Sequence, residues 1–193
     1  MKMIIVLAIF AILTFATADS QIKPKECLKV PVKQNFEPQK YFRGNWFLFN
    51  IKREEGQSNT TVCQESKSRM LEDGTISHVI YAYSDVLKPE FIQINCTGNV
   101  KNTQEKILFQ CTLRKEEVTE NFQMEGTVAE SDYENFAVFY ICSKEGDGFL
   151  VLSRKEDSGP TDPRVTETLK KYGMNLEEFI SRKNVKCKSH PDF

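Results

Sequence analysis

The chain has 193 residues with 26 basic and 27 acidic side chains, so its net charge is close to zero. A near-neutral chain offers neither the basic face that nucleic-acid binding needs nor a polybasic patch for a membrane surface, and we expect neither partner. The length is that of one domain with a buried core.

The first 18 residues have the pattern of a signal peptide. Lys2 supplies the positive start, an apolar run covers residues 3–15, and Ala-Thr-Ala at 16–18 gives the small-x-small pattern that a signal peptidase cuts. The apolar run is shorter than the roughly 20 residues that cross a bilayer as a helix. We therefore expect residues 1–18 to be removed and residues 19–193 to fold as the single domain of a secreted monomer.

Six cysteines follow this segment, and the whole chain has two histidines. An even number of cysteines on an oxidising secretory route predicts that all are paired in disulfides, without fixing which pairs form. The chain has no Cys-x-x-Cys spacing, so we predict no zinc or other metal site. The cysteines are Cys27, Cys63, Cys96, Cys111, Cys142 and Cys187.

Segments rich in β-branched and aromatic residues recur along the chain, with polar turn residues between them. This pattern predicts strands joined by hairpin-length connections. Consecutive antiparallel strands without a long crossover favour an all-β, eight-stranded up-and-down barrel over a Greek-key sandwich. The strands are expected near residues 43–52, 62–71, 75–84, 90–97, 106–114, 121–130, 134–143 and 148–155.

Alternation within two of these strands places a pair of cysteines opposite each other. Around a turn near residues 102–103, Cys96 falls across from Cys111. The two can bridge only from the same face of the sheet, and that face is the apolar one, so the bridge is expected on the inside of the wall. Asn95 then faces outward. Asn95 and Asn59 begin the two Asn-x-Thr sequons and are candidates for glycosylation.

The same alternation defines a set of inward-facing side chains. They either fill a solid core, as in small eight-stranded barrels, or line an apolar cavity that suits a lipid mediator. In the second case Asn50, His78 and Tyr140 orient the polar end of the ligand. His78 is otherwise a core histidine bonded to a neighbour. The candidate cavity residues are Asn50, His78, Ile80, Ala82, Ile92, Ile94, Ile107, Phe109, Phe122, Met124 and Tyr140, and Val128 shares their face.

Beyond the eighth strand the apolar period becomes helical. Pro160 and Pro163 end the strand, and Asp162 can cap a helix whose first residue is Pro163. Gly173 interrupts the apolar stripe, so we expect one kinked helix or two short helices against the outside of the barrel, followed by a tail that Cys187 tethers. The stripe comprises Val165, Leu169, Tyr172, Leu176, Phe179 and Ile180.

Three short motifs resemble the lipocalin signatures. Gly44-Asn45-Trp46 resembles the Gly-x-Trp of the first strand, residues 131–136 resemble the Thr-Asp-Tyr-x-x-Tyr turn, and Arg154 takes the place of the family arginine. The resemblance implies that Trp46 closes the narrow end of a barrel and that the Arg154 guanidinium stacks on its ring as a cation–π pair. The residues with an implied structural role are Gly44, Trp46, Asp132, Tyr133 and Arg154.

A narrower resemblance covers nearly the whole chain. Residues 35–44, 133–142, 150–152 and 176–187 are similar to the salivary lipocalins of blood-feeding triatomine bugs. That resemblance implies an anti-haemostatic role through haem-borne nitric oxide, biogenic amines, eicosanoids such as thromboxane, or clotting proteases and their activation. It also implies the disulfides Cys27–Cys142, Cys63–Cys187 and Cys96–Cys111.

The sequence departs from the related haem-carrying nitrophorins at the iron ligand. Those proteins have a Tyr-His-Tyr-like stretch whose histidine ligates iron, whereas the matching residues here are Tyr81-Ala82-Tyr83. Alanine cannot ligate a metal, and His78 is four residues away, which is about 13 Å along a strand. We therefore expect no haem and no other cofactor.

Charged residues gather in the loops at the expected open end, which are residues 53–61, 84–89, 114–120 and 144–148. Such a rim can attract a protonated amine or a basic protease surface, or it can be a solvated set of loops and nothing more. The acids are Glu54, Glu55, Asp85, Glu116, Glu117, Glu120, Glu145 and Asp147, against the bases Arg53, Lys88, Arg114, Lys115 and Lys144.

No set of residues suggests catalysis. The serines have no recognisable histidine and aspartate partners, and neither His78 nor His190 lies in an acid–base motif. We therefore predict a binding protein without enzymatic activity. The first hypothesis is that it binds a small apolar or amphipathic host mediator, a thromboxane or another prostanoid before others, and so blunts platelet aggregation. The alternatives are inhibition of a coagulation protease or contact-pathway factor, and binding of a biogenic amine.

Overall fold

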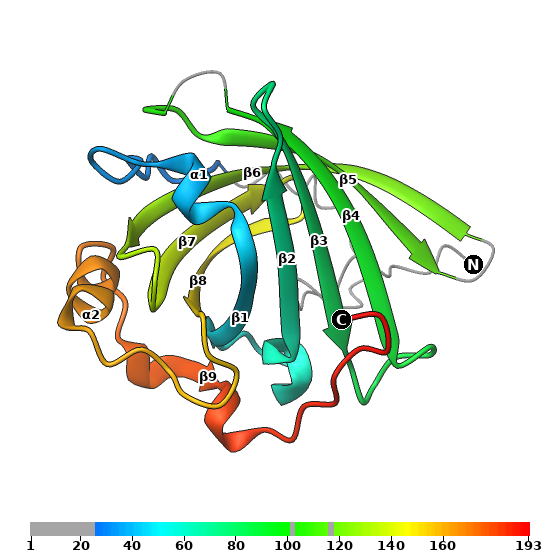
Figure 1. Ribbon diagram of the computed structural model, residues 1–193. Coiled ribbons are helices and arrows are strands. Elements are labelled where there is room, and N and C mark those ends of the chain that lie inside the picture. The colour runs from blue at the N-terminus through cyan, green and yellow to red at the C-terminus, as the bar shows by residue number, and fades with distance from the viewer. Residues whose placement is uncertain (1–25, 101–102, 116–117) are drawn as a thin grey trace.

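The computed structural model describes residues 26–100, 103–115 and 118–193 (Figure 1). The predicted signal peptide at 1–18 and the rim residues Glu116 and Glu117 lie outside these described residues. The strands of the described chain are β1 (Arg43–Lys52), β2 (Gln64–Met70), β3 (Thr75–Tyr83), β4 (Phe91–Asn99), β5 (Ile107–Lys115), β6 (Val118–Ser131), β7 (Phe136–Ser143), β8 (Gly146–Ser153) and β9 (Phe179–Ser181). The helical elements are α1 (Pro38–Tyr41), α2 (Pro163–Lys170) and the 3₁₀ turns η2 (Asn59–Val62), η3 (Leu176–Glu178) and η4 (Arg182–Asn184).

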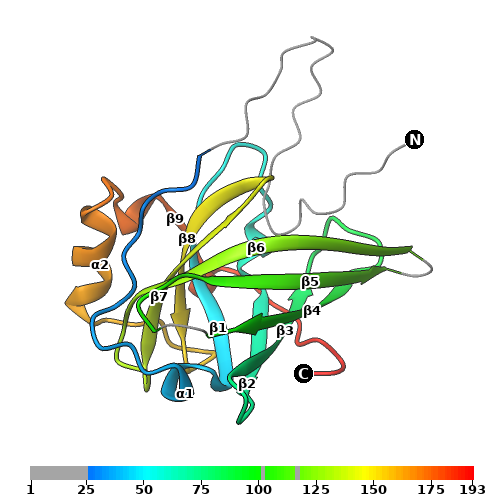
Figure 2. The same ribbon diagram turned by 90° about the horizontal axis from the view of Figure 1, so that it is seen from above.

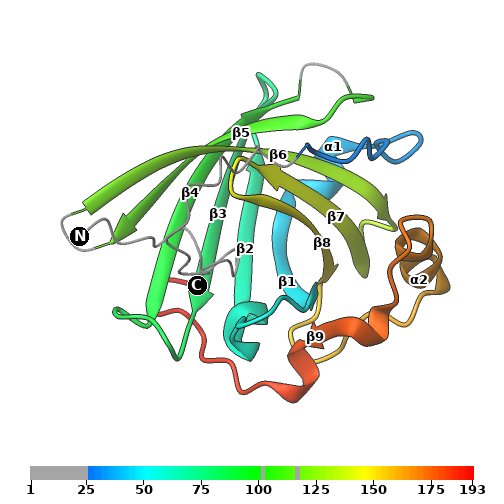
Figure 3. The same ribbon diagram turned by 180° about the vertical axis from the view of Figure 1, so that it is seen from behind.

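Strands β1 to β8 form a closed antiparallel barrel. Each strand pairs with the next one along the chain, and β1 closes the cylinder by pairing with both β2 and β8. Views from opposite sides show the strands curling around one interior (Figure 1, Figure 3). The predicted eight-stranded up-and-down barrel is confirmed. Its short connections favour pairing between strands that are neighbours in the chain.

The disulfides fix the wall and both ends of the described chain. Cys96 lies directly opposite Cys111 in the register of β4 and β5, and the two are bonded. Cys27–Cys142 and Cys63–Cys187 tie the amino-terminal segment and the tail to the barrel across 115 and 124 residues of sequence. All three predicted pairings are confirmed. Bridges that close such long loops restrict the unfolded chain the most.

Two residues predicted to face inward, Asn50 and Tyr140, lie on the outside of the wall instead. A bulge between Leu48 and Asn50 shifts the register of β1 against β8, and the extra residue reverses the alternation of side chains. Asn50 therefore pairs with Val151, whose side chain belongs to an outer apolar layer. Tyr140 belongs to the same layer. Strand β7 is buried on both faces, so its sequence carries no alternation to follow.

Helix α2 packs on the outside of the barrel (Figure 2). Its first residue is Pro163, and the Asp162 side chain accepts a hydrogen bond from the backbone N–H of Arg164, as predicted. Val165 and Leu169 are buried in an outer apolar layer with side chains of β7 and β8, and α2 itself lies against β6 and β7. Within the residues that the structure describes, no helix has the length and hydrophobicity to cross a membrane.

The predicted continuation of the helical stripe to Ile180 is wrong. Gly173 adopts a φ of +70°, a left-handed conformation that ends helices. Beyond it, Phe179–Ser181 forms strand β9, which pairs with β1 near the open end. Ile180 joins the barrel core and Phe179 joins the outer layer. Adjacent apolar residues that face opposite sides of a strand also fit a helical spacing, which explains the error.

A buried ion pair fixes the chain that follows β9. The Arg182 guanidinium donates to the Glu65 carboxylate at 2.9 Å and to the Val62 carbonyl at 3.2 Å, and both charged side chains are only 4% exposed. Burial raises the pKa of Glu65, and the charge of Arg182 opposes that rise. Arg182 also donates to Glu156 at 3.3 Å, so it is Glu65 that depends on its partner, because an unpaired buried charge is strongly destabilising.

Replacing Arg182 by alanine leaves the Glu65 carboxylate buried without its partner. We expect R182A to lower the free energy of unfolding by about 3–5 kcal/mol, measured by urea denaturation at neutral pH. Lys183, the next residue, is exposed and provides a matched control, because K183A should change the same quantity by less than about 0.5 kcal/mol. Equal losses in both variants would contradict a special role for the pair.

Candidate ligand-binding site

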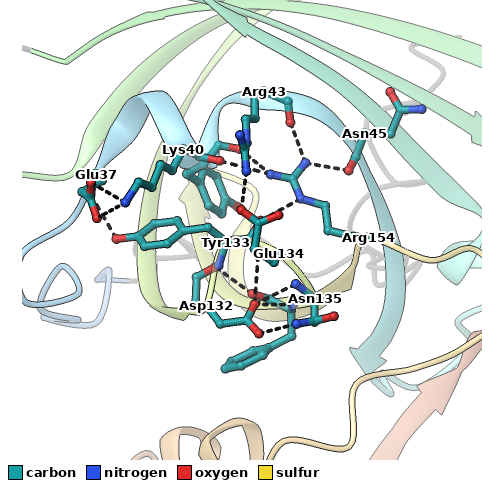
Figure 4. A network of polar contacts seen from close by, with 12 residues as sticks. Glu37, Lys40, Arg43, Asn45, Asp132, Tyr133, Glu134, Asn135 and Arg154 are labelled. Atoms are coloured by element: carbon teal, nitrogen blue, oxygen red, sulfur yellow. Dashed lines mark hydrogen bonds and ion pairs between the residues drawn. The ribbon is translucent and has the colours of Figure 1, made fainter.

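Arg154 closes the narrow end of the barrel (Figure 4). Its guanidinium lies 3.6 Å from the centroid of the Trp46 ring and donates to the backbone carbonyls of Arg43, Asn45 and Tyr41 at 2.6, 2.7 and 3.2 Å. Burial lowers the pKa of Arg154 to about 10, so the group stays charged at neutral pH. The stack implied by the lipocalin resemblance is therefore present as the floor of the barrel.

The turn between β6 and β7 braces this floor (Figure 4). The Asp132 carboxylate accepts hydrogen bonds from the backbone N–H groups of residues 134–136. Burial alone would raise the pKa of Asp132, but these bonds lower it overall. Tyr133 has a φ of +68°, and its hydroxyl accepts a hydrogen bond from the Glu37 backbone N–H at 3.0 Å. The turn is thereby tied to the segment that leads into α1.

An apolar cavity lies inside the barrel next to this floor. Its volume is about 50 Å³, which holds a few water molecules and is well below the roughly 300–1,000 Å³ of sites for drug-sized ligands. Most of its lining residues are aromatic or aliphatic, drawn from the floor and from strands on all sides. They are Tyr41, Phe42, Trp46, Leu48, Gln64, Glu65, Ser66, His78, Ile80, Phe109, Met124, Phe139, Ile141, Leu150 and Leu152.

His78 is the histidine in this wall. Its Nδ1 and the Ser68 hydroxyl are 2.7 Å apart, and its ring centroid is 5.9 Å from that of Phe109. Burial lowers the pKa of His78 to about 4, so the imidazole is neutral at neutral pH. When Ser68 donates to Nδ1, the ring proton resides on Nε2. That arrangement offers one neutral hydrogen-bond donor in an apolar setting.

The predicted cavity residues divide into three groups. His78, Ile80, Phe109 and Met124 line the cavity, and Asn50 and Tyr140 lie outside the wall, as described above. The remaining five are packed in the barrel core without lining the cavity, and they are Ala82, Ile92, Ile94, Ile107 and Phe122. The interior is thus mostly filled, with one narrow space beside the floor.

Several lining residues were missed, each for a local reason. Tyr41 and Phe42 precede the first predicted strand, so alternation could not assign them. Phe139 and Ile141 lie on β7, where both faces are apolar. Gln64 opens strand β2, whose polar sequence gives no core face. A search for aromatic residues just before the Gly-x-Trp motif would have found Tyr41 and Phe42 but none of the other missed residues.

Two of the predicted rim acids hold their own loops in place. The Asp85 carboxylate accepts hydrogen bonds from the Thr60 and Ser58 hydroxyls at 2.7 and 3.0 Å, and these bonds lower its pKa. Asp147 accepts the Tyr140 hydroxyl at 2.8 Å. These carboxylates are therefore engaged within the chain, which reduces the charge that the rim presents to a partner.

The two sequons have different surroundings. Asn59 is exposed at the first position of η2, near the open end. Asn95 is half-buried on the outer face of β4, where its side-chain oxygen accepts a hydrogen bond from Gln93 at 3.0 Å. Glycosylation at either position stays a prediction.

The closed barrel and its Trp46–Arg154 floor define a lipocalin-type binding protein. The nitrophorin family profile matches residues 27–192, and the chain belongs to this family. Triafestin-1 of Triatoma infestans is 30% identical over 96% of this chain and 92% of its own length. Pallidipin of Meccus pallidipennis is 28% identical over 97% of this chain and 98% of its own length. The relatives are triatomine salivary lipocalins, as the sequence resemblance implied.

Solved structures share the fold. The tryptamine complex of the amine-binding protein of Rhodnius prolixus superposes with a TM-score of 0.74 at 17% identity, covering 87% of this chain and 92% of that one. An LTBP1 variant in complex with leukotriene C4 superposes with a TM-score of 0.56 at 20% identity, covering 81% and 91%. Those barrels hold chemically different ligands, so the fold alone does not select one.

The described residues do not fit a haem, although the family name suggests one. Ala82 stands at the position expected for the iron ligand and has no ligating atom. His78 shares its Nδ1 with Ser68 and borders a cavity of only about 50 Å³. Among the residues that the structure describes, no group of three His, Cys, Asp or Glu side chains could hold a metal ion.

His78 links the stability of the barrel to pH. An unfolded histidine titrates near about 6.5, whereas burial holds the pKa of folded His78 at about 4. Between these two pH values, His78 is protonated in the unfolded chain but neutral in the folded protein. The contribution of His78 to stability is therefore complete above about pH 6.5 and is lost as the pH falls towards 4.

Substitution of His78 by glutamine should remove this dependence. We expect the loss of unfolding free energy between pH 7 and pH 4 to be about 3 kcal/mol smaller in H78Q than in the original chain. Urea denaturation at several pH values measures the difference. Parallel pH profiles for the two proteins would show that the folded imidazole titrates like an unfolded one.

Proposed function

We propose that this protein is a secreted carrier that holds one small, largely apolar host mediator inside its barrel, with thromboxane or another prostanoid as the first ligand class. The observation that supports the proposal is the apolar cavity whose histidine is neutral and bonded to Ser68. A hydrocarbon chain suits the wall, and a hydroxyl or carbonyl oxygen suits the Nε2 donor. Such a carrier acts by stoichiometric removal of a platelet agonist, without a catalytic step.

The chemistry of the wall favours a lipid over an amine. Bringing an ammonium group into an apolar cavity is unfavourable by several kcal/mol unless a carboxylate pairs with it. Glu65 supplies the carboxylate among the described lining residues, and it is paired with Arg182. A lipid instead requires lining side chains to change rotamer, which costs on the order of 1 kcal/mol each. Met124 is suited to that adjustment because its side chain is unbranched and flexible.

The small volume supports a second candidate, a compact biogenic amine. The space of about 50 Å³ lies beside the rings of Tyr41, Trp46 and Phe139, which can make a cation–π contact with an ammonium group. The exposed rim acids Glu54 and Glu55 lie at the opposite, open end of the barrel, so the rings would have to hold the ammonium group without a carboxylate. This candidate requires less enlargement of the cavity than a lipid does, but it requires a charge partner that the wall lacks.

Native mass spectrometry of the secreted protein against a mixed panel tests these candidates. The panel contains thromboxane and prostaglandin analogues, leukotrienes, serotonin, histamine, noradrenaline and haem. We expect one discrete prostanoid adduct that survives dilution. An amine adduct alone would establish the second candidate in its place. A folded protein with no adduct would overturn both, and coagulation proteases and contact-pathway factors would be the next partners to test.

Loss of the His78 donor should weaken the binding of an oxygenated lipid more than that of a plain one. H78F keeps a ring in the wall and removes its hydrogen bonds. We expect its affinity for a prostanoid analogue, measured by calorimetry, to fall about 5- to 150-fold, because an unpaired buried oxygen costs about 1–3 kcal/mol. Affinity for arachidonic acid, which lacks the ring oxygens, should change little.

Two further variants serve as controls for that experiment. His190 contacts Tyr81 and Phe91 from the tail, so H190F should bind both lipids normally. Ala82 is buried in the barrel core, so A82W should fill the interior and abolish binding of both. Equal losses of both lipids in H78F would contradict a hydrogen bond between His78 and the ligand.

A further inference from the structure

A second hollow adjoins the ligand cavity at the narrow end of the barrel. Its volume is about 800 Å³, and it is bordered by residues of α1, the start of β1 and the hairpin that joins β2 to β3. These three elements lie together at one end of the barrel (Figure 1). Met70 and Leu71 provide apolar surface there, and Leu71 is 39% exposed. Charged groups of the hairpin also border it. This hollow therefore combines an apolar part with a polar rim.

The wall between the two spaces is thin. Phe42 borders both the cavity and the hollow, and its ring packs against those of Tyr41 and Phe109 at centroid distances of 4.8 and 6.3 Å. Beside it, Ser68 borders the hollow and His78 borders the cavity, and one hydrogen bond of 2.7 Å joins them. Phe42 is thus part of both walls, and the Ser68–His78 hydrogen bond joins one wall to the other.

We propose that the ligand site continues past Phe42 into this hollow, so that an amphipathic lipid of about twenty carbons lies across the floor with its chain in the barrel and its carboxylate in the hollow. The inference rests on the proposed function. A cavity of about 50 Å³ is too small for such a ligand, and the hollow supplies the missing space. The Ser68–His78 pair then borders the middle of the chain, where a prostanoid carries its ring oxygens.

The charges around the hollow support a carboxylate head group. Arg69 is the direct cross-strand partner of Arg43, but Arg43 is paired with Glu134. Arg69 borders the hollow, is exposed, and forms no ion pair with any residue that the structure describes. Its guanidinium can therefore receive a carboxylate through two parallel hydrogen bonds. Glu72 and Asp73, in the hairpin turn, also border the hollow and oppose an anion, so Arg69 is the group that would have to hold the carboxylate.

A length series of saturated fatty acids with about 8 to 20 carbons tests the passage by calorimetry. In the original protein, affinity should rise about fourfold per methylene through most of the series. F42W fills the passage, so the gain should stop at a shorter chain. F42L keeps an apolar side chain of smaller size and should preserve the gain. If F42W follows the original protein at every length, the chain does not pass Phe42 and the proposal is overturned.

Paired substitutions at the hollow test the head group. R69Q should lower the affinity for eicosanoic acid about three- to fivefold, and E72Q should raise it by a similar factor. Neither should alter binding of eicosanol, which has the same chain without the charge. Arg53, exposed near the open end, gives the matched control, and R53Q should bind the acid normally. Equal effects of R69Q on acid and alcohol would overturn the carboxylate assignment.

If a variant fails to fold, photolabelling of the unaltered protein tests the same proposal. A long-chain fatty acid with a diazirine next to its carboxylate is photolysed in the complex, and the labelled peptide is identified by mass spectrometry. We expect labelling of Met70 or Leu71. Labelling of the open-end loop at 84–90 would overturn this inference while leaving the proposed function intact. Failure of the unaltered protein to bind any chain would remove both.

Discussion

The contact of the Arg154 guanidinium with the Trp46 ring determines how the barrel ends. Arg154 follows β8 and Trp46 lies on β1, and these strands become neighbours only when the barrel closes. The same guanidinium donates to carbonyls before and within β1 and in the β6–β7 turn, which uses most of its donors. The floor that results holds Tyr41 and Phe42 against the cavity. The site therefore forms only when β1 and β8 pair and close the barrel.

The sequence predicts the parts of the barrel where one face of the sheet meets water. In β4 and β5 the alternation of apolar and polar residues is regular, so the pattern alone assigns Cys96, Phe109 and Cys111 to the correct face. The same method fails at Asn50, where a bulge adds one residue, and at Tyr140, where helix α2 covers the outer face. A period of two is informative only while the strand is regular and one of its faces is solvated.

Other features depend on contacts between residues far apart in the sequence, which no local pattern reveals. Arg182 and Glu65 meet across 117 residues of sequence, and neither has a neighbour that marks it as buried. The strand at Phe179–Ser181 exists because β1 extends beyond the end of β2 and needs a partner there. The volume of the cavity depends on how side chains from the floor and most strands meet, which composition and spacing do not determine.

The outer apolar layer beneath α2 gives the barrel two unlike sides. Strands β7 and β8 are backed by a second layer of packed side chains, whereas the outer faces of β4, β5 and β6 carry exposed residues such as Thr97, Gln110 and Gln123. A close-packed double layer resists deformation, while a single sheet can change its twist more freely. The protein is two layers thick where its helix lies and one layer thick where it faces water, and the Cys96–Cys111 bond ties that thinner wall together.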